Sequence, residues 1–161
     1  MRTRLAISAV VVASLTAGLG AAATLPGPAA RADQVLQTTR FPLHPVGSEL
    51  PRSVFVEDAH ANGPTIIAHE QYVLNGAQPA ATYQVTLNIF VRDTTCAGAA
   101  GVVFQTAVIT TDAAGNGSGD AFFLPSGVPA VLRNAAHGFI YTVSDSSGVR
   151  YGSGCEVVTL D

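Results

Sequence analysis

Five side chains that can bind metal ions or transfer protons lie within one stretch of fourteen residues, EDAHANGPTIIAHE. They are Glu57, Asp58, His60, His69 and Glu70. Imidazole nitrogens and carboxylate oxygens together suit zinc or copper. The zinc-protease motif is absent, because it needs a second histidine four residues after the first. The stretch therefore has two interpretations: a metal site of His60, His69 and Glu70, or solvated turn residues beside a hydrogen-bonded strand histidine.

Glu70 shares a strand face with apolar side chains, which makes it the most unusual of the five. The side chains on that face of residues 65–74 are Ile66, Ala68, Tyr72 and Leu74. An unpaired carboxylate would be costly there. We consider three explanations: a buried pair with Arg52, Arg92 or Arg150, exposure at the edge of a sheet, or a catalytic acid with a raised pKa.

The other polar motifs indicate turns rather than catalysis. Asp112, Asn116 and Asp120 are spaced by four, whereas a calcium-binding EF-hand loop needs oxygen ligands two residues apart. Gly117-Ser118-Gly119 and Gly152-Ser153-Gly154 lack the strand-to-helix turn that presents a nucleophilic serine. No spacing singles out two carboxylates for glycoside hydrolysis. We therefore expect no enzyme activity and no cofactor.

The first 32 residues match a secretory signal peptide. Arg2 and Arg4 precede a mostly apolar run to Leu19, and small residues follow. Cleavage after Ala23 or after Ala32 fits the small-x-small rule, and the second is favoured because two prolines interrupt the region before it. No second apolar run is long enough to span a bilayer. We expect a secreted, extracellular protein whose mature chain does not insert into a membrane.

Charge and cysteine content limit what the mature chain can bind. Cleavage after Ala32 leaves five arginines and no lysine against 11 acidic residues, a net charge of −6. Such a chain lacks the basic patch that nucleic acid requires. The two cysteines of an exported chain predict one disulfide, Cys96 to Cys155. Closing a loop of about 60 residues, it would contribute roughly 4 kcal/mol at most.

Alternating apolar and polar residues predict seven strands and almost no amphipathic helix. The clearest is 81–91, in which Tyr83, Val85, Leu87, Ile89 and Val91 share one face. The other expected strands are 53–57, 65–74, 102–111, 121–124, 137–145 and 149–160. We expect 102–124 to form a hairpin and 125–134 to contain one helical turn that crosses between sheets.

Seven short strands and one cysteine pair in about 130 residues indicate an all-β, antiparallel β-sandwich with one disulfide. A small β-barrel is the alternative. The expected organisation is a signal peptide at 1–32, an extended proline-containing lead-in at 33–52 and one β-sandwich domain at 53–161.

The run Ala81-Thr82-Tyr83-Gln84-Val85, then a cysteine, then Thr110-Thr111-Asp112-Ala113-Ala114-Gly115-Asn116-Gly117, resembles the immunoglobulin-like sandwich modules of uncharacterised secreted bacterial proteins. Within that group it is similar to the neocarzinostatin-type apoproteins, which carry an enediyne chromophore in a cleft of a seven-stranded sandwich. The resemblance covers 81–124 and implies an immunoglobulin-like, seven-stranded sandwich. That family has two disulfides, whereas this chain has cysteines for one, so no binding residues are carried over.

The expected function is that of a secreted, non-catalytic binding or structural module that acts through its loops. Its partner would be a protein, a glycan or a small ligand, with contacts at His60, Asn62, Asp112 and Asn116. One alternative is a metal-dependent or carboxylate hydrolase that uses residues 57–70. The other is a small-molecule carrier with a deep apolar cleft between its sheets.

Overall fold

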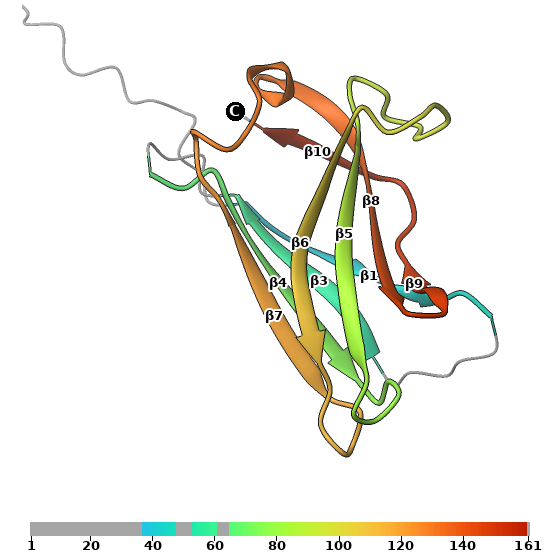
Figure 1. Ribbon diagram of the computed structural model, residues 1–161. Helices are drawn as coiled ribbons and strands as arrows, with labels where there is room; N and C mark the ends of the chain where they lie inside the picture. Colours follow the sequence, from blue (N-terminus) through green and yellow to red (C-terminus); the bar gives the residue numbers. More distant parts are fainter. Residues whose placement is uncertain (1–36, 48–52, 61–64, 161) are drawn as a thin grey trace, which may run out of the picture. The chain divides into compact units, whose positions relative to one another are not determined.

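The computed structural model describes residues 37–47, 53–60 and 65–160 (Figure 1). Strand β5 (Thr82–Phe90) is the interior strand that the sequence predicted, with β8 (Ala135–Asp145) on one side and β6 (Val102–Thr110) on the other. Its side chains at 83, 85, 87 and 89 are all buried. The period of two therefore assigned the buried face of this strand correctly.

The described strands form two antiparallel sheets. Sheet A has the order β1-β3-β4-β7 and contains Gln37–Pro42, Ser53–His60, Ala68–Asn75 and Gly117–Phe123. Sheet B has the order β2-β9-β8-β5-β6, where β2 is His44–Pro45 and β9 is Gly148–Gly152, and β10 (Glu156–Leu160) also pairs with β8. Buried side chains from both sheets form one hydrophobic cluster. The prediction of an all-β, antiparallel fold is confirmed.

The described residues contain ten strands rather than seven. Strands β1 and β2 lie in the segment that was expected to be an unpaired lead-in, and they pair with β3 and β9. Pro42 and Pro45 are compatible with this because β1 and β2 are edge strands, where a missing N–H costs no ladder bond. The run 149–160 divides into β9 and β10.

Strands β6 and β7 do not form the expected hairpin. Strand β6 pairs with β5 in sheet B, and β7 pairs with β4 in sheet A, so the turn 111–116 carries the chain from one sheet to the other. Gly115 fixes this crossing, because a Cβ there would lie 2.0 Å from the carbonyl oxygen of Ala77. No ladder joins β6 to β7 among the described strands.

The expected helical turn is present as a single 3-10 turn, η1 (Ala130–Leu132), which follows Pro129 and links β7 of sheet A to β8 of sheet B. Leu132 is its buried residue. None of the described residues forms a helix long and apolar enough to cross a membrane.

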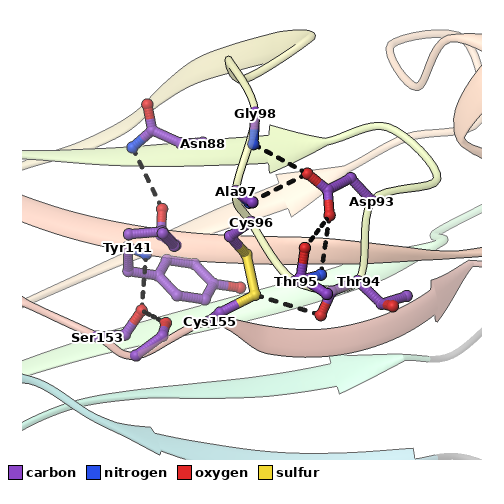
Figure 2. The surroundings of a disulfide bond; sticks show 12 residues. Asn88, Asp93, Thr94, Thr95, Cys96, Ala97, Gly98, Tyr141, Ser153 and Cys155 are labelled. Atoms are coloured by element: carbon purple, nitrogen blue, oxygen red, sulfur yellow. Dashed lines mark hydrogen bonds between the residues drawn. A yellow bond between two sulfur atoms is a disulfide. The ribbon is translucent and has the colours of Figure 1, made fainter.

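The predicted disulfide between Cys96 and Cys155 is formed, with an S–S distance of 2.03 Å (Figure 2). It ties the loop after β5 to the segment between β9 and β10. The carboxylate of Asp93 organises that loop by accepting bonds from the backbone N–H groups of Thr95, Ala97 and Gly98, as Figure 2 shows.

Gly138 is required where the disulfide crosses β8. A Cβ at this position would lie 2.4 Å from the carbonyl oxygen of Asp93 and 2.5 Å from the sulfur of Cys96. We expect Gly138→Ala to lower the free energy of unfolding by more than about 2 kcal/mol, because backbone and a disulfide cannot give way as a flexible side chain can. Gly152→Ala is the control, since its Cβ would meet only an oxygen at 3.8 Å. Equal loss in both variants, measured by urea denaturation with the disulfide intact, would contradict this packing.

Candidate functional site

The inner face of sheet A carries a row of buried polar side chains at one end. Strand β3 continues past its expected end at Glu57 to His60, so that Asp58 and His60 follow Val54 and Val56 on the buried face. Asp58 lies directly opposite Glu70 of β4 in the strand register. Asp58 is fully buried and Glu70 is 1% exposed. Two carboxyl groups therefore face each other in the core.

Two tyrosine hydroxyls donate hydrogen bonds to Glu70. Tyr72 of β4 donates to Oε2, and Tyr141 of β8 donates to Oε1 at 2.8 Å. The second bond joins the two sheets. Of the three arginines proposed as partners, Arg150 bonds to Asp145, Arg52 lies outside the described residues, and Arg92 is not among the hydrogen-bond partners of Glu70. The expected exposed position of Glu70 is wrong, and so is the expected pair with Arg92 or Arg150.

Burial dominates the electrostatics of Glu70. Burial, and then the neighbouring carboxyl of Asp58, raise the pKa of Glu70 to about 8, while the bonds from Tyr72 and Tyr141 lower it by less. Burial also raises the pKa of both tyrosines far above its ordinary value. The phenols consequently remain protonated donors, and Glu70 is mainly a neutral carboxylic acid at pH 7. We call Asp58, His60, Glu70, Tyr72 and Tyr141 the acid cluster.

His60 closes the acid cluster on the β3 side. Its Nε2 lies 2.5 Å from Oδ2 of Asp58, while its Nδ1 and the other oxygen of Asp58 have no hydrogen-bond partner in the described part of the chain. His60 and Glu70 border a cavity of about 10 Å³ whose other lining residues are apolar. That volume holds about one water molecule. It is far below what a small-molecule carrier would need, so we place no ligand there.

His60, His69 and Glu70 do not converge, so the proposed metal site is wrong. Strand alternation turns His69 to the opposite face of β4 from Glu70. There its ring stacks on Phe122 with centroids 4.2 Å apart, and Nε2 is 3.9 Å from Asp120. No group of three potential metal ligands occurs among the residues that the structure describes. Glu57 is exposed on the outer side of β3, so the hydrolase residues do not share one face either.

The described residues that were expected to contact a partner have structural roles instead. His60 is 4% exposed and is a core residue rather than a loop residue. Oδ1 of Asp112 accepts the N–H groups of Ala114 and Asn116, both at 2.8 Å, and these bonds help to lower the pKa of Asp112. The side-chain oxygen of Asn116 accepts the N–H of Gly76. Asp112 and Asn116 therefore hold the crossing turn, and Asn62 lies outside the described residues.

A second candidate site lies where β6 and β7, each paired with one other described strand, form neighbouring edges of the two sheets. We call it the edge groove. Its volume is about 390 Å³, and its lining residues are Phe104, Gln105, Thr106, Ala121, Phe122, Phe123, Leu124, Ser126 and Gly127. The rings of Phe104 and Phe123 meet edge to face, 5.7 Å apart.

The surroundings of the edge groove are mainly apolar, although Asp120 lies on β7 and His69 stacks on the groove residue Phe122. Four large apolar side chains on or next to its two strands are 49–60% exposed: Val103, Val108, Phe122 and Leu124. No charged residue occurs from 94 to 111, which includes all of β6, or from 121 to 132. Edge strands usually carry charges or prolines that discourage pairing with other chains, and β6 has neither. This surface can therefore accept an additional uncharged strand.

Comparison of the chain with protein-family models, curated proteins and solved structures found no match. The site must therefore be interpreted from its own geometry. Of the acid cluster, sequence reasoning placed Glu70 and Tyr72 on one buried face, but it interpreted Asp58 and His60 as metal ligands or turn residues and did not include Tyr141. An unbroken alternation from Val54 to His60 would have placed Asp58 on the inner face. No local signal could have brought in Tyr141, which is 71 residues away.

The bond between Tyr141 and Glu70 should contribute to stability across the sheets. We expect Tyr141→Phe to lower the free energy of unfolding by about 1–2 kcal/mol, because it leaves a buried carboxyl oxygen without its donor. Tyr83→Phe is the matched control, since that equally buried phenol only accepts a 3.2 Å bond from the N–H of Gln78. Urea denaturation at pH 6 compares the two variants. A loss no larger in Tyr141→Phe than in Tyr83→Phe would show that the inter-sheet bond contributes nothing.

Proposed function

We propose that the protein is a secreted, non-catalytic β-sandwich module of the immunoglobulin-like type that binds an extended, uncharged segment of another protein in the edge groove. The observation that carries this proposal is an uncharged, apolar edge strand beside a groove of about 390 Å³. Such an edge offers unpaired backbone N–H and C=O groups along β6, and apolar side chains for specificity.

Two features of the fold support the sandwich and the extracellular compartment. The two antiparallel sheets contribute their inner side chains to one cluster, which is how sandwich cores are built. A disulfide between segments far apart in the chain suits an oxidising environment. The disulfide agrees with the signal peptide expected at residues 1–32.

The edge groove supports binding better than the loops do. The loop residues Asp112 and Asn116 are engaged in their own turn, whereas the apolar residues around the groove remain exposed. Exposed apolar surface bordered by polar residues is typical of protein interaction sites. The acidic mature chain would repel acidic partners elsewhere on its surface, so an uncharged segment fits this edge best.

The shape of β6 limits where the segment pairs. The register between β5 and β6 shifts at Val85/Thr86, where Thr106 is the extra residue on β6. A bulge of this kind bends and twists the strand. The groove lies at 104–106, so the added segment should pair with the half of β6 that begins at Val102 and extend toward Phe123 of β7.

A peptide library displayed on phage would test the proposal with the disulfide-intact mature protein as target. We expect selection of uncharged peptides with alternating apolar residues that bind in the micromolar range. Bound peptide should slow hydrogen exchange of β6 amides that have no partner in β5.

Charged variants of equal exposure locate the binding site. Val103→Lys/Val108→Lys places two charges on β6. Val46→Lys/Val157→Lys places two at similarly exposed positions, after β2 and on β10, which lie on the other side of β8 from β5 and β6. We expect the first pair to weaken peptide binding at least tenfold and the second to leave it within about twofold. Equal effects of the two pairs, or recovery of no peptide, would contradict the proposal.

A further inference from the structure

The acid cluster has a geometry that the proposed binding function does not use. Asp58 and Glu70 are cross-strand neighbours, and both are buried. Side chains in such pairs have Cβ atoms about 5 Å apart, and like charges there are destabilising even at a surface. In a buried site, two carboxyl groups this close cannot both be ionised without a cation between them.

The surroundings of the pair identify which carboxyl keeps a proton. Asp58 contacts His60, a basic side chain that can hold a positive charge. Glu70 receives bonds from Tyr72 and Tyr141, which are neutral donors. An acid with neutral partners only is the one that remains protonated in a low-dielectric core.

No other ionisable group faces Glu70 among the residues that line the adjacent cavity. The groups that face it are Asp58 and His60 from β3, Tyr72 from its own strand and Tyr141 from β8. The lining side chains from β5, β6, β7, η1 and β10 are all apolar. Of these residues only His60 can carry a positive charge, and it bonds to Asp58 rather than to Glu70.

We propose that the acid cluster is a buried proton-binding site: Glu70, which accepts a hydrogen bond from Tyr141 of sheet B, holds one proton, and the loss of that proton in alkaline medium weakens the folded protein. The bound species is a single proton taken from solvent on folding. The proton resides on the Glu70 carboxyl, and its release leaves a carboxylate beside Asp58.

The sign of the pH dependence follows from the raised pKa of Glu70. Between the ordinary value of 4.5 and about 8, the folded chain holds a proton on Glu70 that the unfolded chain does not. The contribution of Glu70 to stability is therefore fully present below pH 4.5, declines as pH rises, and is lost above about 8. The decline is at most tenfold per pH unit in the folding constant, about 1.4 kcal/mol.

Other titratable groups contribute to the pH dependence of stability in the opposite direction. Their contributions cancel when two variants are compared. Burial lowers the pKa of His137, which costs stability as pH falls below about 6.5. Hydrogen bonds lower the pKa of Asp93, Asp112 and Asp145. Protonation of these three carboxylates costs stability only below about pH 4. These contributions are common to wild type and to Glu70→Gln, which keeps the shape of the side chain but cannot ionise.

The experiment measures folding constants by urea denaturation from pH 5 to pH 8. We expect the ratio of the wild-type constant to that of Glu70→Gln to fall by more than a hundredfold over this range. The control variant Glu57→Gln removes an exposed carboxyl on β3, and its ratio should stay within about twofold. A ratio for Glu70→Gln that is constant or rises with pH would overturn the proposal.

A second measurement uses only the wild-type protein and tests for the proton on Glu70 even if Glu70→Gln fails to fold. Carbon-13 NMR of protein labelled at the glutamate side-chain carboxyl follows each glutamate separately. We expect one resonance, assigned to Glu70, to titrate near pH 8. Titration of every glutamate below pH 5 would overturn the proposal.

Discussion

The burial of every second side chain in β4 brings Glu70 into the core, and the arrangement around it follows from that constraint. A buried carboxyl needs hydrogen-bond donors, and Tyr72 and Tyr141 supply them. Because Tyr141 belongs to the other sheet, satisfying Glu70 also fixes how β8 lies against β4. The apolar side chains of both sheets then fill the space around this bond. One polar interaction thus links the polar end of the inner face of sheet A to sheet B.

Much of the fold could be predicted because its signals are local. The alternation in β5 and the turn at Asp145–Gly148 between β8 and β9 each involve only a few consecutive residues. The cysteines are far apart in the chain, but two cysteines allow only one disulfide. The partner of a strand is not a local property. Strands β6 and β7 have the spacing of a hairpin, yet the turn between them crosses from sheet B to sheet A. Strands β1 and β2 were not predicted because they contain prolines, which are tolerated in edge strands.

The difference between local and non-local signals also explains which parts of the candidate site could be predicted. The alternation of the strand predicted that Glu70 faces the core. Its partner could not be predicted, because an arginine and a tyrosine can both bond to a carboxyl group and the sequence does not show which one faces it. His69 and His60 were grouped by proximity in sequence, although alternation places His69 with Phe122 on the outer side. The edge groove was missed because it depends on which strands remain unpaired.

The central claim is that Glu70 lies in the core as a neutral acid bonded to Tyr141 of the other sheet. Neutron diffraction from a deuterated crystal grown near pH 6 tests it most directly, because it locates deuterons on both groups. The account predicts a deuteron on the Glu70 carboxyl and the Tyr141 hydroxyl pointing at its other oxygen. A carboxylate without a deuteron, or a Tyr141 hydroxyl directed elsewhere, would contradict it.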